Sequence, residues 1–103
     1  MQFMVNIEVS VPADLPQKDK DDLRRRETDR ALELMKANKL RRIWRIVGQV
    51  ANFSVWEADS LEELHANLGS LPLYPYMKVT VTPVIQHPAT EAWLKAHGAL
   101  PPF

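Results

Sequence analysis

Glu27 is a carboxylate at a position where the surrounding pattern predicts an apolar side chain. Apolar residues recur at spacings of three and four on either side of it, at Leu23, Ala31, Leu34 and Met35. No proline or glycine occurs in 17–37, so we predict one long amphipathic helix with Glu27 on its apolar stripe. Desolvation there would raise the pKa of the carboxyl toward neutrality, which suits a general base or acid. Alternatively, Glu27 lies at the edge of the stripe and pairs with Arg24 or Arg30.

His65 is a second polar residue on an apolar helical face, between Leu61 and Leu68. A lone histidine in such a place is either a hydrogen-bonded core residue or a catalyst or ligand. No two histidines have the i, i+4 spacing of a helical metal site, and the chain has no cysteine to supply a thiolate. We therefore expect no metal site.

Trp44 and Arg45 belong to a basic, aromatic strand that also contains Arg41 and Arg42. Alternation places Arg41 and Arg45 on one face of this strand and Arg42 and Trp44 on the other. Because the set is divided between two faces, it makes no continuous platform for single-stranded nucleic acid, and we expect no nucleic-acid partner. A single arginine is enough to bind a small carboxylate.

Asn52 and Ser54 share one face of the next predicted strand. They either donate hydrogen bonds to a bound oxygen or coat a solvated face. Val50 and Trp56 lie on the same face, which makes it partly apolar. We expect this to be the second, helix-free face of a sheet, and we expect another subunit to cover it.

Periodicity defines the elements that position these residues. It predicts strands at 3–11, 40–47, 50–57 and 77–82, helices at 17–37 and after a Ser60 cap, and a short last helix at 90–97. This order predicts an α+β, ferredoxin-like βαββαβ fold: a four-stranded antiparallel sheet with two helices on one face. We predict a single domain over 1–103, with a core at 3–88 and a C-terminal helix and tail at 89–103.

The composition is that of a soluble globular chain. Lys plus Arg and Asp plus Glu both number 13, so no global field attracts polyanions or anionic membranes. The N-terminus lacks a basic segment followed by an apolar one, and no apolar run approaches the roughly 18 residues of a spanning helix. We expect a cytoplasmic protein with no membrane partner. Phosphate loops and nucleophile elbows are absent from the sequence.

Several dense blocks resemble the muconolactone delta-isomerase family. They are Trp44-Arg45-Ile46, Gly48, Ala51-Asn52, Ser54-Val55, Leu64-His65, the run from Leu71 to Met77, and His87-Pro88. The similarity extends from Phe3 to about Pro88, and Glu27 lies where that family also has a helical glutamate. Two prolines within Leu71 to Met77 predict a rigid connection.

The resemblance implies a cofactor-free isomerase of aromatic catabolism, in the 3-oxoadipate pathway, that converts muconolactone to 3-oxoadipate enol-lactone. It implies a lactone as the small-molecule partner and a homo-oligomer, a ring-shaped decamer, with pockets shaped by more than one subunit. Within it, Glu27 would be the catalytic base and Arg45 the carboxylate anchor. The remaining substrate-binding residues would be Trp44, Asn52, Ser54, His65 and Tyr76.

Two alternatives stay open. The chain could be a non-catalytic relative of the dimeric α+β barrel type that binds a small organic acid or merely assembles, or an isomerase or dehalogenase for a substituted lactone. Glu27 separates binding from catalysis, because a pure binding module gains little from desolvating a carboxylate.

Overall fold

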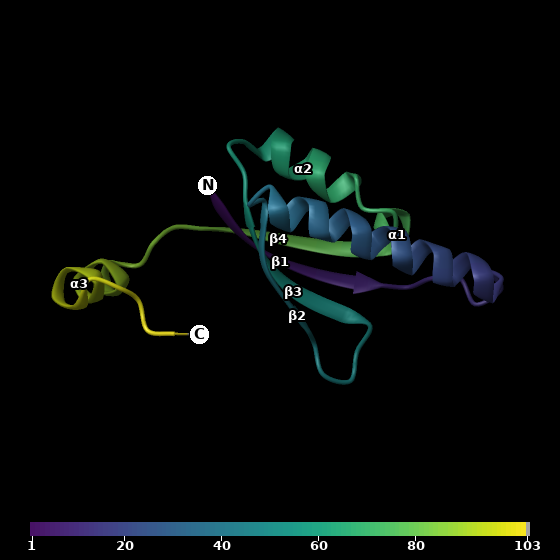
Figure 1. Ribbon diagram of the computed structural model, residues 1–103, viewed down its shortest axis with the longest axis horizontal. Coiled ribbons are helices and arrows are strands. Elements are labelled where there is room, and N and C mark those ends of the chain that lie inside the picture. Colours follow the sequence, from purple (N-terminus) through teal and green to yellow (C-terminus); the bar gives the residue numbers. More distant parts are fainter. Residues whose placement is uncertain (103) are drawn as a thin grey trace.

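The computed structural model of the chain describes residues 1–102. Its elements, in chain order, are β1 Gln2–Val9, α1 Gln17–Lys36, β2 Leu40–Arg45, β3 Ala51–Glu57, α2 Leu61–Gly69, the 3₁₀ turn η1 Tyr74–Tyr76, β4 Met77–Val84 and α3 Pro88–His97 (Figure 1). The helix α1 ends at Lys36 because Asn38 adopts the left-handed conformation, with φ of 60°.

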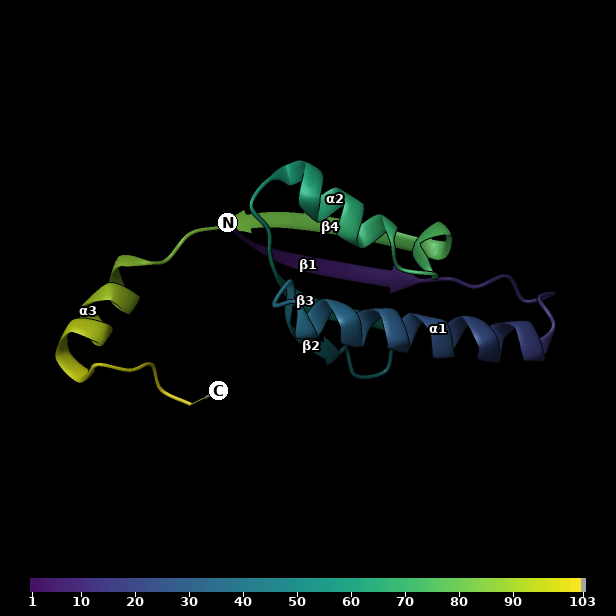
Figure 2. The ribbon, with the colours of Figure 1, turned by 45° about the horizontal axis from the view of Figure 1, so that its top comes forward.

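The four strands form one antiparallel sheet in the order β2-β3-β1-β4. Figures 1 and 2 show α1 and α2 together on one side of this sheet. The predicted ferredoxin-like βαββαβ fold is therefore confirmed. No helix within residues 1–102 is long and apolar enough to cross a membrane.

Alternation along β1 supplies the centre of the core. Phe3, Val5 and Ile7 are at most 2% exposed and face the helices. Leu34 of α1, Leu64 and Leu68 of α2, and Trp56 of β3 pack in the same cluster. The helices thus cover the face of the sheet to which every second residue of β1 points.

The prediction for the faces of β3 is wrong. The register pairs Trp56 with Phe3 and Ser54 with Val5, so Asn52, Ser54 and Trp56 face the helices rather than the open side. Trp56 Nε1 donates to Ser54 Oγ over 2.8 Å, and Ser54 Oγ donates to the carbonyl of Val5 over 3.3 Å. These bonds satisfy both polar groups, which is why a hydroxyl and an indole N–H tolerate full burial.

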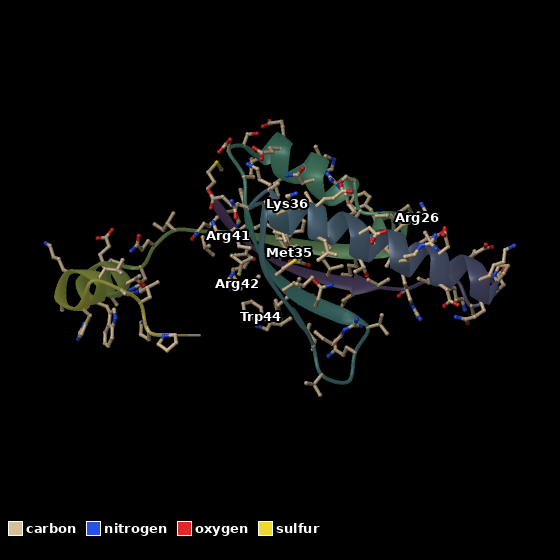
Figure 3. The ribbon with its side chains drawn as sticks, viewed as in Figure 1. Arg26, Met35, Lys36, Arg41, Arg42 and Trp44 are labelled. Atoms are coloured by element: carbon tan, nitrogen blue, oxygen red, sulfur yellow. The ribbon has the colours of Figure 1, made fainter. Side chains whose placement is uncertain are left out.

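The open face of the sheet carries other residues of β2 and β3. Phe53 stands opposite Trp44 in the register, and the two side chains are 45% and 41% exposed. Figure 3 shows Trp44 and Arg42 projecting from β2 away from α1. The apolar patch on the uncovered face is therefore built around Phe53.

The helix α2 begins as predicted, but only part of its predicted inner face is buried. Ser60 Oγ accepts a hydrogen bond from the N–H of Glu63, while the Glu63 carboxylate accepts one from the N–H of Asp59 rather than from that of the cap. Leu64 and Leu68 are the buried residues of the helix. His65 is exposed, so its predicted place on the inner face is wrong.

Candidate active site

A hollow of about 730 Å³ lies between α1 and the nearby ends of the strands. We call it the α1 hollow. Four parts of the chain meet there: α1 contributes Glu27, β2 contributes Arg45, β3 contributes Asn52, and the segment after α2 contributes Leu73. The fold therefore brings three of the predicted site residues to one place, although they lie far apart in sequence.

Glu27 is half-buried on α1. The backbone N–H of Leu73 donates to its Oε1 over 2.8 Å. Burial raises the pKa of Glu27 above its ordinary value, and the Leu73 hydrogen bond offsets part of that rise. Such a carboxylate is a stronger base than an exposed one and still has Oε2 available for a proton.

Neither arginine proposed as an alternative partner forms an ion pair with Glu27. Arg30 instead binds the carboxylate of Glu33 over 2.7 Å and the hydroxyl of Ser70 over 2.9 Å. Across residues 1–102, the ion pairs of the structure do not include Glu27. No cation therefore counteracts the desolvation that raises the pKa of Glu27.

The proline-rich connection from Leu71 to Met77 holds the Leu73 amide in position. The N–H of Tyr74 donates to the carbonyl of Leu71, and the N–H of Tyr76 donates to that of Leu73, each over 2.9 Å. The Tyr76 carbonyl accepts from the N–H of Ser10 over 2.9 Å and ties the segment to the end of β1. The connection thus fixes the backbone N–H of Leu73 as a hydrogen-bond donor to Glu27.

Arg45 and Asn52 are partners in the β2–β3 register and project to the same face of the sheet, into the hollow. Asn52 Oδ1 is buried and has no hydrogen-bond partner. An unsatisfied buried acceptor costs about 1–3 kcal/mol, so a polar ligand in the hollow would recover that energy. A carboxamide can turn over to present either its oxygen or its two N–H donors.

The other predicted substrate-binding residues do not line the hollow. Ser54 is fully buried in the core, and Trp44 lies on the open face of the sheet because adjacent residues of β2 alternate. His65 is on the exposed side of α2, and the half-buried Tyr76 lies in η1. Within one subunit, the structure separates these four side chains from Glu27.

Two further cations line the hollow, and sequence reasoning named neither as a substrate-binding residue. Lys20 and Arg24 line the hollow from α1, and the sequence suggested Arg24 only as an ion-pair partner of Glu27. Their spacing from Glu27, seven and three residues, puts all three on one side of the helix, and this signal could have found them. With Arg45 opposite, three cations line the same hollow as Glu27 without forming an ion pair with it, which favours an anionic ligand.

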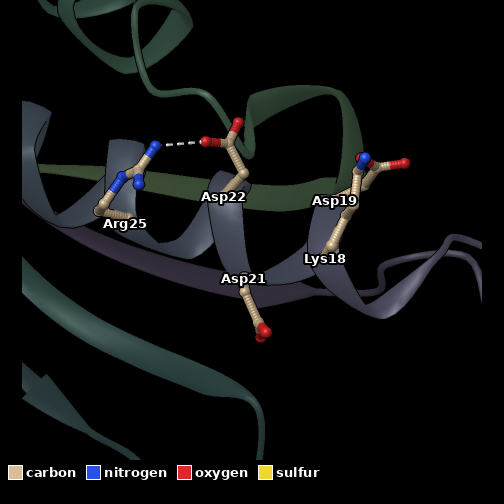
Figure 4. A pocket seen from close by; sticks show the side chains of 5 residues that line it. All are labelled: Lys18, Asp19, Asp21, Asp22 and Arg25. Carbon is tan, nitrogen blue, oxygen red and sulfur yellow. Dashed lines mark hydrogen bonds and ion pairs between the residues drawn. The ribbon is translucent and has the colours of Figure 1, made fainter.

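A second recess, of about 690 Å³, lies at the start of α1 and has a different character. Figure 4 shows its lining of Lys18, Asp19, Asp21, Asp22 and Arg25. The Asp22 carboxylate already pairs with Arg25 and Arg26, and these side chains are largely exposed. This recess is a solvated helix end whose lining has two cations and three carboxylates. No group of three potential metal ligands occurs among residues 1–102.

The fold and the hollow define a class of protein: a small ferredoxin-like α+β enzyme domain with one desolvated carboxylate facing an anion-attracting hollow. A sequence model of the family described as muconolactone delta-isomerase matches residues 1–90. The chain belongs to the muconolactone delta-isomerase family.

Individual relatives agree with this assignment. The chain is 40% identical over 90 residues to the muconolactone delta-isomerase of Cupriavidus pinatubonensis, covering 87% of this chain and 98% of that protein. It is 41% identical to muconolactone delta-isomerase 1 of Acinetobacter lwoffii, covering 87% of this chain and 94% of that one. The crystal structure of a muconolactone isomerase superposes with a TM-score of 0.82 at 37% identity, over 86% of this chain and 93% of that one.

Proposed function

We propose that this protein isomerises muconolactone, or a close analogue, to 3-oxoadipate enol-lactone by moving one proton between two ring carbons. Family membership supports an isomerase, and one feature of the chain carries the assignment: a half-buried carboxylate, Glu27, held by a backbone N–H in a hollow with three cations. The proposed reaction needs one base and adds no atom to the substrate.

Glu27 is the proposed base. Its Oε2 takes the proton from the ring carbon that is vinylogously acidic to the lactone carbonyl, which leaves a 2-oxyfuran-like anion. The same carboxyl then returns the proton to the ring carbon next to the carbonyl. The Leu73 N–H holds Oε1 throughout, so the carboxylate keeps one orientation for both transfers.

Charge placement around Glu27 suits the rest of the substrate. Arg45 is the proposed anchor for the acetate side chain, and Asn52, once its amide presents N–H, donates to the oxyanion that forms on the lactone. Lys20 and Arg24 add positive potential at the same hollow, which favours the anion over the neutral ring. These roles require only the residues that line the hollow.

We also propose that the protein is a homo-oligomer, as the resemblance to a decameric family implies. We propose a cytoplasmic location, as expected for an enzyme that acts on a small metabolite. The exposed apolar patch around Phe53 on the open sheet face supports assembly. Light scattering tests the oligomer: a decamer has ten times the subunit mass of 11.8 kDa.

Incubation with muconolactone tests the reaction, because the ultraviolet absorbance of the lactone changes as its double bond moves. We expect turnover without added metal or cofactor. If a correctly assembled oligomer leaves muconolactone unchanged, the substrate is a substituted lactone or the protein only binds small acids. Chlorinated and methylated lactones in the same assay separate these two outcomes.

A further inference from the structure

The α1 hollow carries more positive charge than a ligand with one carboxylate needs. Lys20, Arg24 and Arg45 line it together with the carboxylate of Glu27. Among the lining residues that the structure describes, two positive charges therefore remain uncompensated. Muconolactone has a single carboxylate, and Arg45 is the proposed anchor for it. Lys20 and Arg24 are left to face a second negative charge.

Arg24 differs from the other arginines of α1 because its guanidinium is unpaired. Arg25, Arg26 and Arg30 each bind a carboxylate of the same helix. Within residues 1–102, no hydrogen bond or ion pair engages the guanidinium of Arg24 or that of Arg45. Both groups line the hollow, and each has five N–H donors to offer to a ligand.

Lys20 lies one helical turn before Arg24, and residues four apart on a helix are neighbours. We call these two residues the helix cations. Lys20 Nζ donates to the carbonyl of Ala13 over 3.5 Å, a long bond that a carboxylate ligand would improve on. At 1.5 Å per residue, Arg24 and Lys20 lie about 5 Å and 10 Å from Glu27 along the axis, toward the helix start.

The positive groups reach the hollow from two sides. Arg45 is the last residue of β2, whereas the helix cations belong to the first half of α1, which projects past the sheet in Figures 1 and 2. Apolar side chains, among them Val9, Leu32, Ile43 and Met77, form much of the remaining lining. This arrangement suits two anionic groups joined by a hydrocarbon segment. A polyphosphate lacks the apolar part.

The proposed reaction itself puts a second negative charge into the hollow. Its 2-oxyfuran-like intermediate carries an oxyanion in addition to the acetate carboxylate. A site that stabilises this short-lived dianion should also bind a stable one. Hydrolysis of the lactone supplies such a dianion: one water breaks the acyl–oxygen bond, the carbonyl becomes a second carboxylate with loss of a proton, and the released enol becomes a ketone.

We propose that the α1 hollow binds an acyclic six-carbon dicarboxylate, with one carboxylate on Arg45 and the other on the helix cations. Such a compound competes with the lactone, so ring-opened forms of the substrate or product inhibit the enzyme. The binding is independent of the reaction, and only the inhibition rests on the proposed function.

Calorimetric titration of the full-length protein with adipate and with monomethyl adipate tests the binding. The two probes share one carbon chain and differ by one charge. Both titrations use the same ionic strength, because salt screens such contacts. We expect adipate to bind at least fivefold more tightly than its ester. Equal affinities, or no measurable binding of adipate, would overturn the proposal.

Two double variants locate the second carboxylate. Lys20→Gln with Arg24→Gln should reduce the preference for adipate over the ester to less than twofold. The control, Arg25→Gln with Arg26→Gln, removes the same charge from the same helix, where both arginines bind Asp22, and should keep the wild-type preference. Because the ratio of two affinities is measured in each protein, a general loss of affinity cancels. A preference that survives without the helix cations, or that the control also loses, would contradict the proposed contact.

Steady-state kinetics test the inhibition. Adipate should raise the KM for muconolactone and leave kcat unchanged. An unchanged KM at adipate concentrations that saturate the site in calorimetry would exclude competition in the hollow. If the full-length protein is inactive on every lactone, the proposed function and the inhibition fail, and calorimetry still decides the dicarboxylate site.

Discussion

Two opposing influences set the protonation of Glu27. Burial raises its pKa, and the hydrogen bond from Leu73 lowers it again. A base works best when its pKa lies near the working pH, since it must be deprotonated before the reaction and still bind the proton during it. In this chain, burial on α1 raises the pKa of Glu27 and one backbone donor limits that rise.

Replacement of the base should abolish most of the activity. Glu27→Gln keeps the side-chain shape and the contact with Leu73 but removes the basic oxygen, so kcat should fall roughly 10²–10⁴-fold. The matched control is Glu33→Gln on the exposed side of the same helix, which should stay within about twofold. Near-normal turnover by Glu27→Gln, with unchanged oligomer mass, would exclude Glu27 as the base.

The Leu73 hydrogen bond should be visible in the pH profile. Leu73→Pro removes the N–H at a residue whose φ of −82° is close to that of proline, and Leu73→Ala loses the side chain but keeps the N–H. Without the donor, the pKa of Glu27 rises further, so the acid limb of kcat/KM should move to higher pH in Leu73→Pro relative to Leu73→Ala. Coincident limbs would show that the bond does not tune the base.

Sequence reasoning could find Glu27 because an acid interrupts an apolar stripe, and it could find Arg45 and Asn52 through the family blocks. It could not find the Leu73 donor, because a backbone N–H has no residue type and its direction depends on how the connection folds. Lys20 was missed for another reason: charged residues surround α1, and only the position of the strands decides which of them line a hollow.

At the scale of elements, β3 shows how far alternation can be trusted. Both of its faces carry aromatic or apolar residues, Phe53 and Val55 on one and Trp56 on the other, so hydropathy alone does not choose the buried face. Ser54 and Asn52 made the truly buried face look solvated. The Ser54–Trp56 hydrogen bond allows both polar groups to be buried on the helix side of the sheet. The sequence alone does not reveal this bond, because it shows only that the two residues share one strand face.

Removal of that bond should cost stability and leave catalysis nearly intact. Ser54→Ala strands the buried indole N–H of Trp56, which should lower the free energy of unfolding by about 1–3 kcal/mol. Trp56→Phe removes the donor as well, so the double variant should be less destabilised than the sum of the single ones. Denaturant unfolding at one subunit concentration measures this, and strict additivity would contradict the coupling.

At the scale of the whole molecule, the main feature is the sheet face that a single subunit leaves exposed. Four strands with helices on one side expose the other side, and this face combines polar residues of β1 and β4 with the patch around Phe53. Sequence analysis predicted a face that a neighbour covers but assigned it to the wrong residues of β3. The expectation of assembly therefore now rests on Phe53.

A charge on this face should weaken assembly. Phe53→Lys introduces an ammonium where apolar contact with a second subunit is expected, and burying an unpaired charge is costly. Light scattering should report a smaller particle at a given concentration. Leu61→Lys is the control, because Leu61 is a comparably exposed apolar residue on α2 and its replacement should leave the mass unchanged. If the Phe53→Lys and Leu61→Lys oligomers have the same mass, the sheet face is not part of the interface.

The hydrogen bond between Leu73 and Glu27 joins positions 46 residues apart in the chain. Helix α1 can form from local contacts within microseconds, whereas this bond must wait until β2, β3 and α2 have brought the connection back to α1. During refolding, helical signal should therefore return before full activity does. The subunit becomes competent for proton transfer only once the second half of the chain has docked. A partly folded subunit therefore contains Glu27 but lacks the Leu73 hydrogen bond that tunes its pKa.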